Sequence, residues 1–126
     1  MERPVPDPTL DPGPLDELLE TVGGDREFLG ELIETYLSDT PELLAALTGG
    51  LADGDAVVVR RAAHTLKSTS ATFGATRLAG LGREIEAAAA ADDLAGLGPQ
   101  VEAAAAEFGL VAPALRAAAD AGGPEA

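Results

Sequence analysis

Apolar residues recur every three to four positions through most of the chain, which is the spacing of amphipathic helices. Five segments carry this pattern, at about residues 14–22, 25–48, 55–73, 76–91 and 99–120. No segment alternates apolar and polar residues with a period of two, and alanine, the best helix former, is abundant. Short turns containing Gly or Asp join the segments. The pattern therefore predicts an all-α fold, an antiparallel up-and-down four-helix bundle with a short additional N-terminal helix.

Prolines and glycines predict where these helices begin, bend and end. We expect Pro14 to open the first helix, Pro41 to kink the second and Gly49-Gly50 to end it. Both ends of the chain are rich in Pro or Gly. This divides the chain into a disordered proline-rich tail at 1–9, the bundle at 10–119 and a flexible tail at 120–126. The aromatic residues fall on the apolar stripes and are predicted to be core: Phe28, Tyr36, Phe73 and Phe108.

Composition excludes several classes of function. The 126 residues include no cysteine, which excludes disulfides, zinc-thiolate sites and a cysteine nucleophile. A net charge of −14 argues against nucleic acid as a partner. There is no apolar run long enough for a membrane span or a signal peptide. We therefore expect a cytoplasmic protein with no membrane contact. We also expect a monomer, because the apolar stripes are used up inside one bundle.

The only histidine of the chain, His64, lies in the third segment within the stretch RRAAHTLKS. At about 100° per residue, it falls opposite the stripe predicted to face the core. That stripe consists of Val58, Val59, Ala62, Leu66, Thr69 and Phe73. The predicted exposed neighbours of His64 are Arg60 and Arg61 one turn back, Lys67 and Ser68 one turn on, and Val57 and Ala71 a turn further out.

The charge around His64 has the opposite sign to that of the chain. Residues 56–83 contain five of the eight basic residues and none of the 22 acidic ones. A cluster of cations without counterions suggests an anionic partner, and a neutral imidazole beside it offers a nucleophilic nitrogen. The alternative is a solvated surface histidine without a task. With no cysteine partner and no carboxylate expected beside His64, we predict neither a metal site nor a hydrolase site.

The run from His64 to Glu86, HTLKSTSATFGATRLAGLGREIE, resembles the signature of histidine-containing phosphotransfer (HPt) domains. In that signature His-x-Leu-Lys-Gly is followed by a Gly ten residues after the His, a Leu four further on, and a closing apolar-Glu pair. The resemblance extends over about residues 10–119.

The resemblance implies a phosphocarrier of a phosphorelay. His64 would accept a phosphoryl group from the aspartate of one receiver domain and pass it to another, and Lys67 would stabilise the group. The implied partners are receiver domains of response regulators and hybrid histidine kinases. These receivers would supply the Mg²⁺. The chain itself would then bind no cofactor and would not be a complete enzyme. The residues expected to dock the receiver are Val57, Arg60, Arg61, Ser68, Ala71 and Gly74.

Two residues depart from the family pattern. Ser68 stands where the family usually has Gly, and its hydroxyl could crowd the receiver or donate a hydrogen bond to the phosphate. Gly82 stands where the family often has Cys or Ala, which costs roughly 1 kcal/mol of helix stability but keeps the packing close. Ser68 leaves open an alternative function, a helical adaptor or inhibitor that binds receivers without relaying phosphate. A small metal-dependent or acid-base enzyme is a third, more distant alternative.

Overall fold

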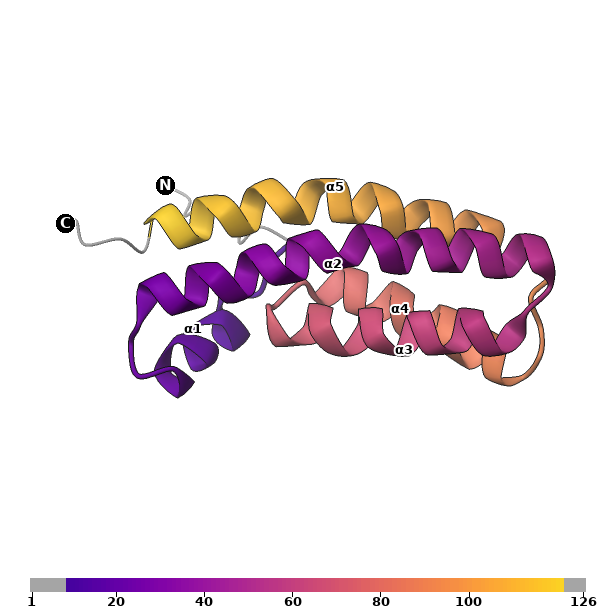
Figure 1. Ribbon diagram of the computed structural model, residues 1–126, viewed down its shortest axis with the longest axis horizontal. Helices are drawn as coiled ribbons and strands as arrows, with labels where there is room; N and C mark the ends of the chain where they lie inside the picture. The colour runs from indigo at the N-terminus through magenta and orange to yellow at the C-terminus, as the bar shows by residue number, and fades with distance from the viewer. Residues whose placement is uncertain (1–8, 122–126) are drawn as a thin grey trace, which may run out of the picture.

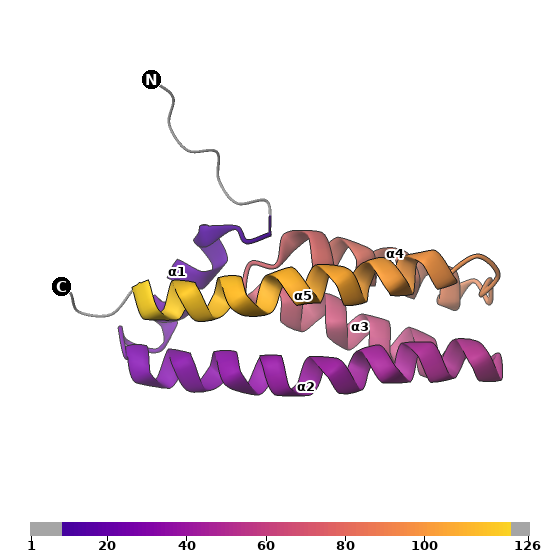
Figure 2. The same ribbon diagram turned by 90° about the horizontal axis from the view of Figure 1, so that it is seen from above.

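The computed structural model describes residues 9–121, and within them it contains five α-helices and no strand. The helices are α1 (Pro12–Thr21), α2 (Arg26–Asp53), α3 (Ala56–Thr72), α4 (Thr76–Ala90) and α5 (Gly98–Ala121). Helices α2 to α5 run antiparallel along the long axis, and α1 lies across one end (Figures 1 and 2). Around the bundle, α3 packs between α2 and α4, and α5 closes the ring between α4 and α2. The predicted four-helix bundle with an additional N-terminal helix is confirmed.

Aspartates begin three of the helices. Asp25 accepts a hydrogen bond from the Phe28 amide, and Asp55 accepts one from the Val58 amide. Asp11 accepts one from the Gly13 amide at the start of α1, which begins at Pro12, two residues before the predicted Pro14. These side chains satisfy amide groups that the first turn of a helix leaves without a backbone partner.

The second helix is longer than the sequence predicted. It continues through Pro41 and through Gly49-Gly50, and it ends only at Gly54, which has φ 67°. The prediction of an end at Gly49-Gly50 is wrong because Gly50 serves packing: a Cβ there would lie 2.7 Å from Cγ2 of Val59 on α3. Next to Pro41, the Thr40 hydroxyl donates to the Tyr36 carbonyl at 2.7 Å. Packing against α3 therefore carries the helix across residues that would weaken it in isolation.

The centre of the bundle combines aliphatic residues with one aromatic cluster. Tyr36 stacks on Phe73 with ring centroids 4.8 Å apart and meets the edge of Phe108 at 6.3 Å. The Tyr36 hydroxyl also forms a buried 2.7 Å hydrogen bond with Ser70. Burial raises the pKa of Tyr36, so the phenol stays neutral and can donate. The aliphatic side chains without exposed surface include Leu47, Val59, Leu66, Leu78, Ile85, Val111 and Leu115.

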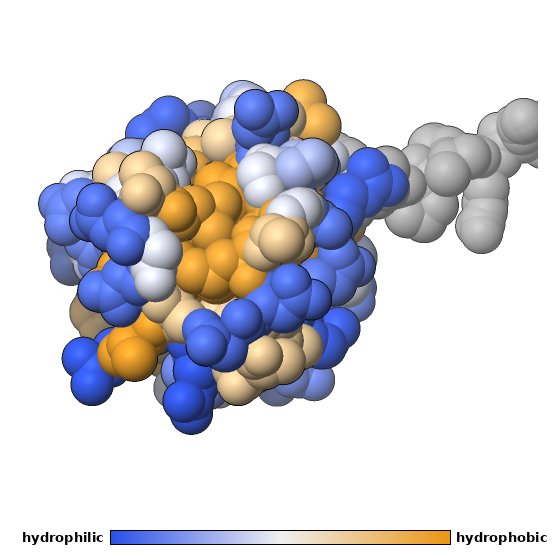
Figure 3. Space-filling view, turned by 90° about the vertical axis from the view of Figure 1, so that its right-hand side faces the viewer, coloured by the Kyte–Doolittle hydropathy of each residue, from blue (hydrophilic) through white to orange (hydrophobic). Residues whose placement is uncertain are grey.

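Two residues predicted to be core are exposed. Phe28 is 43% exposed, because the first turn of α2 extends past the ends of α3 and α4 (Figure 1). Val58 is 38% exposed, and its neighbour Val57 56%, in the first turn of α3. Apolar side chains gather at that end of the bundle (Figure 3). Periodicity identifies the apolar face of a helix but does not show how far the neighbouring helices cover it.

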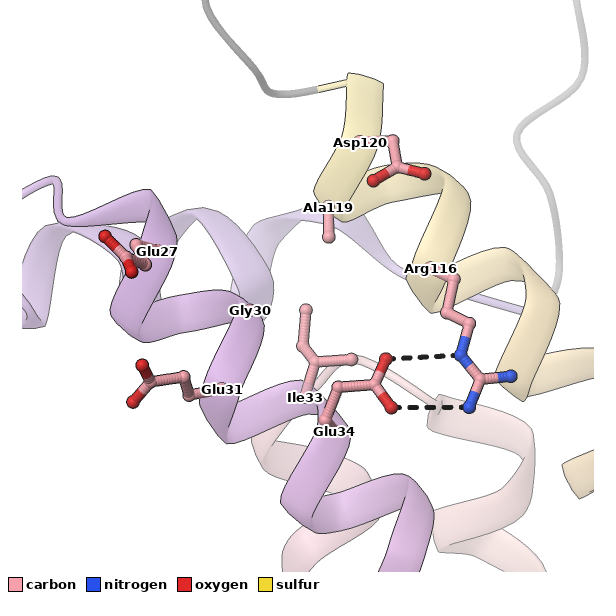
Figure 4. A pocket seen from close by; sticks show the side chains of 8 residues that line it. All are labelled: Glu27, Gly30, Glu31, Ile33, Glu34, Arg116, Ala119 and Asp120. Carbon is pink, nitrogen blue, oxygen red and sulfur yellow. Dashed lines mark hydrogen bonds and ion pairs between the residues drawn. The ribbon is translucent and has the colours of Figure 1, made fainter.

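At the other end of the bundle, one charged pair joins α2 to α5. The Arg116 guanidinium donates to both oxygens of Glu34, at 3.2 and 3.4 Å (Figure 4). Ile33, Glu27 and Glu31 line the surface beside this pair. Both partners are more than half exposed, so the pair adds little to stability.

Gly74 connects α3 to the segment before α1. It is buried with φ 80°, and its carbonyl accepts a 2.7 Å hydrogen bond from the Asp11 amide. A Cβ at this position would clash with the Asp11 carbonyl oxygen. Thr9 is buried and α5 reaches Ala121, while the predicted domain bounds of 10–119 stay a prediction. The rest of the predicted tails, residues 1–8 and 122–126, lies outside the described residues.

Gly74→Ala should therefore destabilise the protein. The left-handed backbone conformation costs a residue with a Cβ about 1–2 kcal/mol, and displacement of Asp11 adds to this. We expect a loss on the order of 2–3 kcal/mol in the free energy of unfolding by urea. Gly109→Ala on α5, where a Cβ meets nothing within 4 Å, is the control and should not destabilise the bundle. Equal stability of the two variants would contradict the role of Gly74.

Within residues 9–121, no helix combines the length and the apolar character needed to cross a membrane.

Candidate phosphoacceptor site

His64 projects from the middle of α3 to the surface of the bundle. Its side chain is 60% exposed, while Ala63 and Leu66 on either side of it have no exposed surface. These two residues hold α3 against the core, so the imidazole stands on a rigid part of the helix. The predicted position of His64, opposite the core stripe, is confirmed.

A carboxylate from α4 holds the imidazole. Nδ1 of His64 lies 2.8 Å from Oε2 of Glu86, and the other oxygen of the same carboxylate lies 2.7 Å from Nζ of Lys67. One carboxylate thus bridges the histidine and the lysine. The hydrogen bond from Lys67, and then that from His64, lower the pKa of the Glu86 carboxyl below its usual 4.5. Glu86 is therefore ionised at neutral pH.

This contact corrects two predictions. The sequence predicted no carboxylate beside His64 and cations without a counterion, because residues 56–83 contain no acidic residue and Glu86 lies beyond them. The side chain of Lys67 is only 30% exposed and is paired. A carboxylate that orients the imidazole is present after all. Even so, no group of three or more His, Cys, Asp or Glu side chains within residues 9–121 could hold a metal ion.

Gly82 brings α3 and α4 close enough for this bridge. A Cβ at Gly82 would lie 3.0 Å from the Lys67 amide nitrogen and 3.1 Å from the Ala63 carbonyl oxygen. Any larger residue would push the helices apart by a few tenths of an ångström. Glu86 follows Gly82 by one helical turn, on the same side of α4. The predicted role of Gly82 in close packing is confirmed, and it places the carboxylate under the imidazole.

The bridge determines which ring nitrogen can react. With Glu86 ionised, Nδ1 carries the proton and donates it to Oε2. Nε2 then bears the lone pair, and it forms no hydrogen bond with any residue of the part of the chain that is described. Because the ring is mostly exposed, this nitrogen is open to a partner molecule. The site can therefore present an oriented imidazole nucleophile.

The predicted docking residues do not all lie on one surface. Val57, Arg60 and Arg61 line a shallow depression with His64 and Glu86. Ser68 and Ala71 are exposed further along α3, outside that depression. Of the six residues predicted to dock the receiver, Gly74 alone is buried. Gly74 packs against the Asp11 backbone, where its lack of a side chain serves the packing of α1, and its role in docking stays a prediction.

The sequence and structure were compared with known proteins. The family model of the Hpt domain matches residues 31–121, a range that includes the whole site. The chain belongs to the Hpt domain family. Its structure is similar to histidine-containing phosphotransfer protein B (HptB) from Pseudomonas aeruginosa PAO1, with a TM-score of 0.82 and 30% identity over 90% of this chain and 96% of that one.

A second solved structure has the same fold. It is the HPT domain of the Hpt sensor hybrid histidine kinase from Shewanella, with a TM-score of 0.70 and 21% identity over 88% of this chain and 93% of that one. A comparison with curated proteins gives no match. Membership of the Hpt family confirms the resemblance seen in the sequence and supports a phosphotransfer role in a phosphorelay.

The pH dependence of stability should reveal the Glu86 bridge. Folding lowers the pKa of Glu86, so the ionised carboxylate stabilises the fold above pH 4.5. This stabilisation is lost as the pH falls through the lowered pKa. Glu86→Gln should therefore be less stable than the parent at pH 7, by no more than the ~1 kcal/mol typical of exposed pairs. The difference should shrink at about pH 3. Urea unfolding at the two pH values measures it, and a difference that is the same at both would contradict the bridge.

Proposed function

We propose that Nε2 of His64 accepts a phosphoryl group from the phosphoaspartate of a receiver domain and returns it to the aspartate of another. The observation that carries the proposal is the Glu86 carboxylate, which binds Nδ1 at 2.8 Å and Lys67 at 2.7 Å. It fixes the tautomer in which Nε2 is the nucleophile, and it holds a cation one helical turn away. The partners would be receiver domains of response regulators and hybrid histidine kinases.

The transfer step conserves atoms and charge. The Nε2 lone pair attacks phosphorus, the bond from phosphorus to the aspartyl oxygen breaks, and the aspartate leaves as a carboxylate. The imidazole keeps its Nδ1 proton and becomes cationic when Nε2 binds phosphorus. Glu86 stabilises that positive charge, since its carboxylate already accepts the Nδ1 hydrogen bond. Transfer to a second receiver is the same step in reverse.

Lys67 would stabilise the transferred group. A phosphoryl group carries close to two negative charges, and a lysine ammonium pairs with such oxygens as a point charge. Lys67 can turn part of its hydrogen bonding from Glu86 to the phosphoryl oxygens because it has three donors. Arg60 and Arg61 form no ion pair with the described residues, so their charge is available to attract the acidic pocket of a receiver.

The chain would act as a carrier, with catalysis supplied by its partner. We expect Mg²⁺ to be held by the receiver, where it neutralises charge on the reacting phosphoryl group. We also expect a monomer, in which the exposed side chains around His64 contact a receiver and not a second copy of the chain.

Labelling from receivers tests this function. The protein, incubated with Mg²⁺ and a panel of phosphorylated receivers, should acquire one phosphate. As a phosphoramidate, that phosphate should survive alkali and be lost in acid, the reverse of an acyl phosphate on Asp or Glu. If no receiver labels the protein while some still bind it, the phosphocarrier proposal fails and the adaptor function takes its place.

A further inference from the structure

A groove runs between α2 and α3 beside the phosphoacceptor site. Asp39, Glu42 and Leu43 of α2 line it on one side, and Thr65 and Thr69 of α3 on the other. Thr65 follows His64 in the chain and also lines the depression that contains His64 and Glu86. The two hollows therefore adjoin at Thr65, so a partner seated over His64 would lie beside the groove.

The two helices that form the groove carry opposite charge. Helix α3 has three basic residues and no acidic one, whereas α2 has six acidic residues and a single basic one, Arg26 at its first position. Within residues 9–121, no ion pair joins α2 to α3. Asp39 and Glu42 form no ion pair at all there. Their charges are thus available to a partner.

The lining of the groove fits a long cationic side chain. Leu43 and the methyl groups of Thr65 and Thr69 offer apolar contacts along its length. Asp39 and Glu42, three positions apart on one face of α2, place two carboxylates at its edge. A lysine or arginine packs its methylene stem on apolar surface while its charged end meets carboxylates. An anionic side chain would be repelled.

We propose that this groove receives a lysine or arginine of the receiver domain whose phosphoaspartate meets His64, and that it selects among receivers. The inference rests on the proposed function. With this groove, the docking surface has an acidic half beside the cationic half that Arg60 and Arg61 form. A receiver that fits must then carry acidic groups around its phosphoaspartate and a basic side chain to one side of it. Matched charges of this kind determine partner choice and association rate more than they add affinity.

The test reverses the two charges. The double variant Asp39→Lys/Glu42→Lys should accept phosphate from a receiver that labels the parent with kcat/KM about three- to tenfold lower, the size expected for two exposed charges. The deficit should shrink at high salt because exposed charges are screened. The matched control, Glu102→Lys/Asp120→Lys, makes the same change in net charge on α5, across the bundle from α3, and should stay within about twofold of the parent.

Two further measurements separate docking from chemistry. Phosphoramidate, a small donor that needs no docking surface, should label the parent and Asp39→Lys/Glu42→Lys equally. A receiver in which the basic residue is reversed to glutamate should transfer better to this variant than to the parent. Transfer equal to that of the control, or an equal loss with phosphoramidate, would overturn the groove proposal. If phosphoramidate labels the parent but no receiver does, the proposed function itself fails.

Discussion

Replacing His64 with glutamine should reduce phosphorylation of this chain by a receiver to background while leaving the bundle folded. The histidine is the only imidazole of the chain, and a glutamine amide forms no phosphoramidate under these conditions. The side chain of His64 is 60% exposed, so its replacement opens no cavity in the core. Labelling from a phosphorylated receiver measures the first effect, and circular dichroism during thermal unfolding measures the second.

The position of the phosphate on the ring tests the mechanism more closely. Because Glu86 holds Nδ1 at 2.8 Å, the phosphate should be found on Nε2. Nitrogen-15 NMR of the labelled imidazole distinguishes the two isomers. Glu86→Gln is a matched variant, since its amide oxygen can still accept the Nδ1 hydrogen bond, and it should keep the Nε2 isomer. Phosphate on Nδ1 of the parent, or equal labelling of His64→Gln, would contradict the proposed mechanism.

The fold could be predicted from the sequence because its signals are local. Helical periods located all five helices, and Asp25 and Asp55 marked two of their starts. The errors occurred where tertiary packing outweighs local preference. Gly49-Gly50 continues a helix because Gly50 lies against Val59, and Phe28 is exposed because its neighbours end before it.

The site could be predicted only in part, because it is assembled from two helices. His64 and Lys67 share the exposed face of α3, so their spacing alone placed them together. Glu86 lies on α4, 22 residues after His64, and reaches them only through the packing of the two helices. The resemblance contained a usable signal, since its closing Glu follows Gly82 by one turn, and Gly82 marks close approach. Gly74, the glycine of the motif, has a positive φ, a backbone conformation that the motif could not reveal without the structure.

Lys67→Ala should lower the rate of phosphoryl transfer to His64 far more than it lowers stability. A charge-assisted hydrogen bond contributes about 1.5–3 kcal/mol, and screening at this partly exposed site reduces that, so we expect a loss of about tenfold. The variant also leaves the Glu86 carboxylate without its cation, so that it repels the incoming phosphoryl group. The ion pair itself should contribute no more than ~1 kcal/mol to folding. Rapid-quench transfer kinetics and urea unfolding measure the two effects.

Two comparisons separate the position of this charge from its mere presence. Arg26→Ala removes one positive charge at the far end of α2, where it forms no ion pair with a described residue, and should leave the transfer rate unchanged. In a Glu86→Gln background, Lys67→Ala should have a smaller effect, since the unneutralised carboxylate is gone. If Lys67→Ala and Glu86→Gln had independent effects on the transfer rate, Lys67 would act on the phosphoryl group alone and not through the carboxylate that it shares with His64. Transfer by Lys67→Ala at the parental rate would show that this lysine serves only to pair with Glu86.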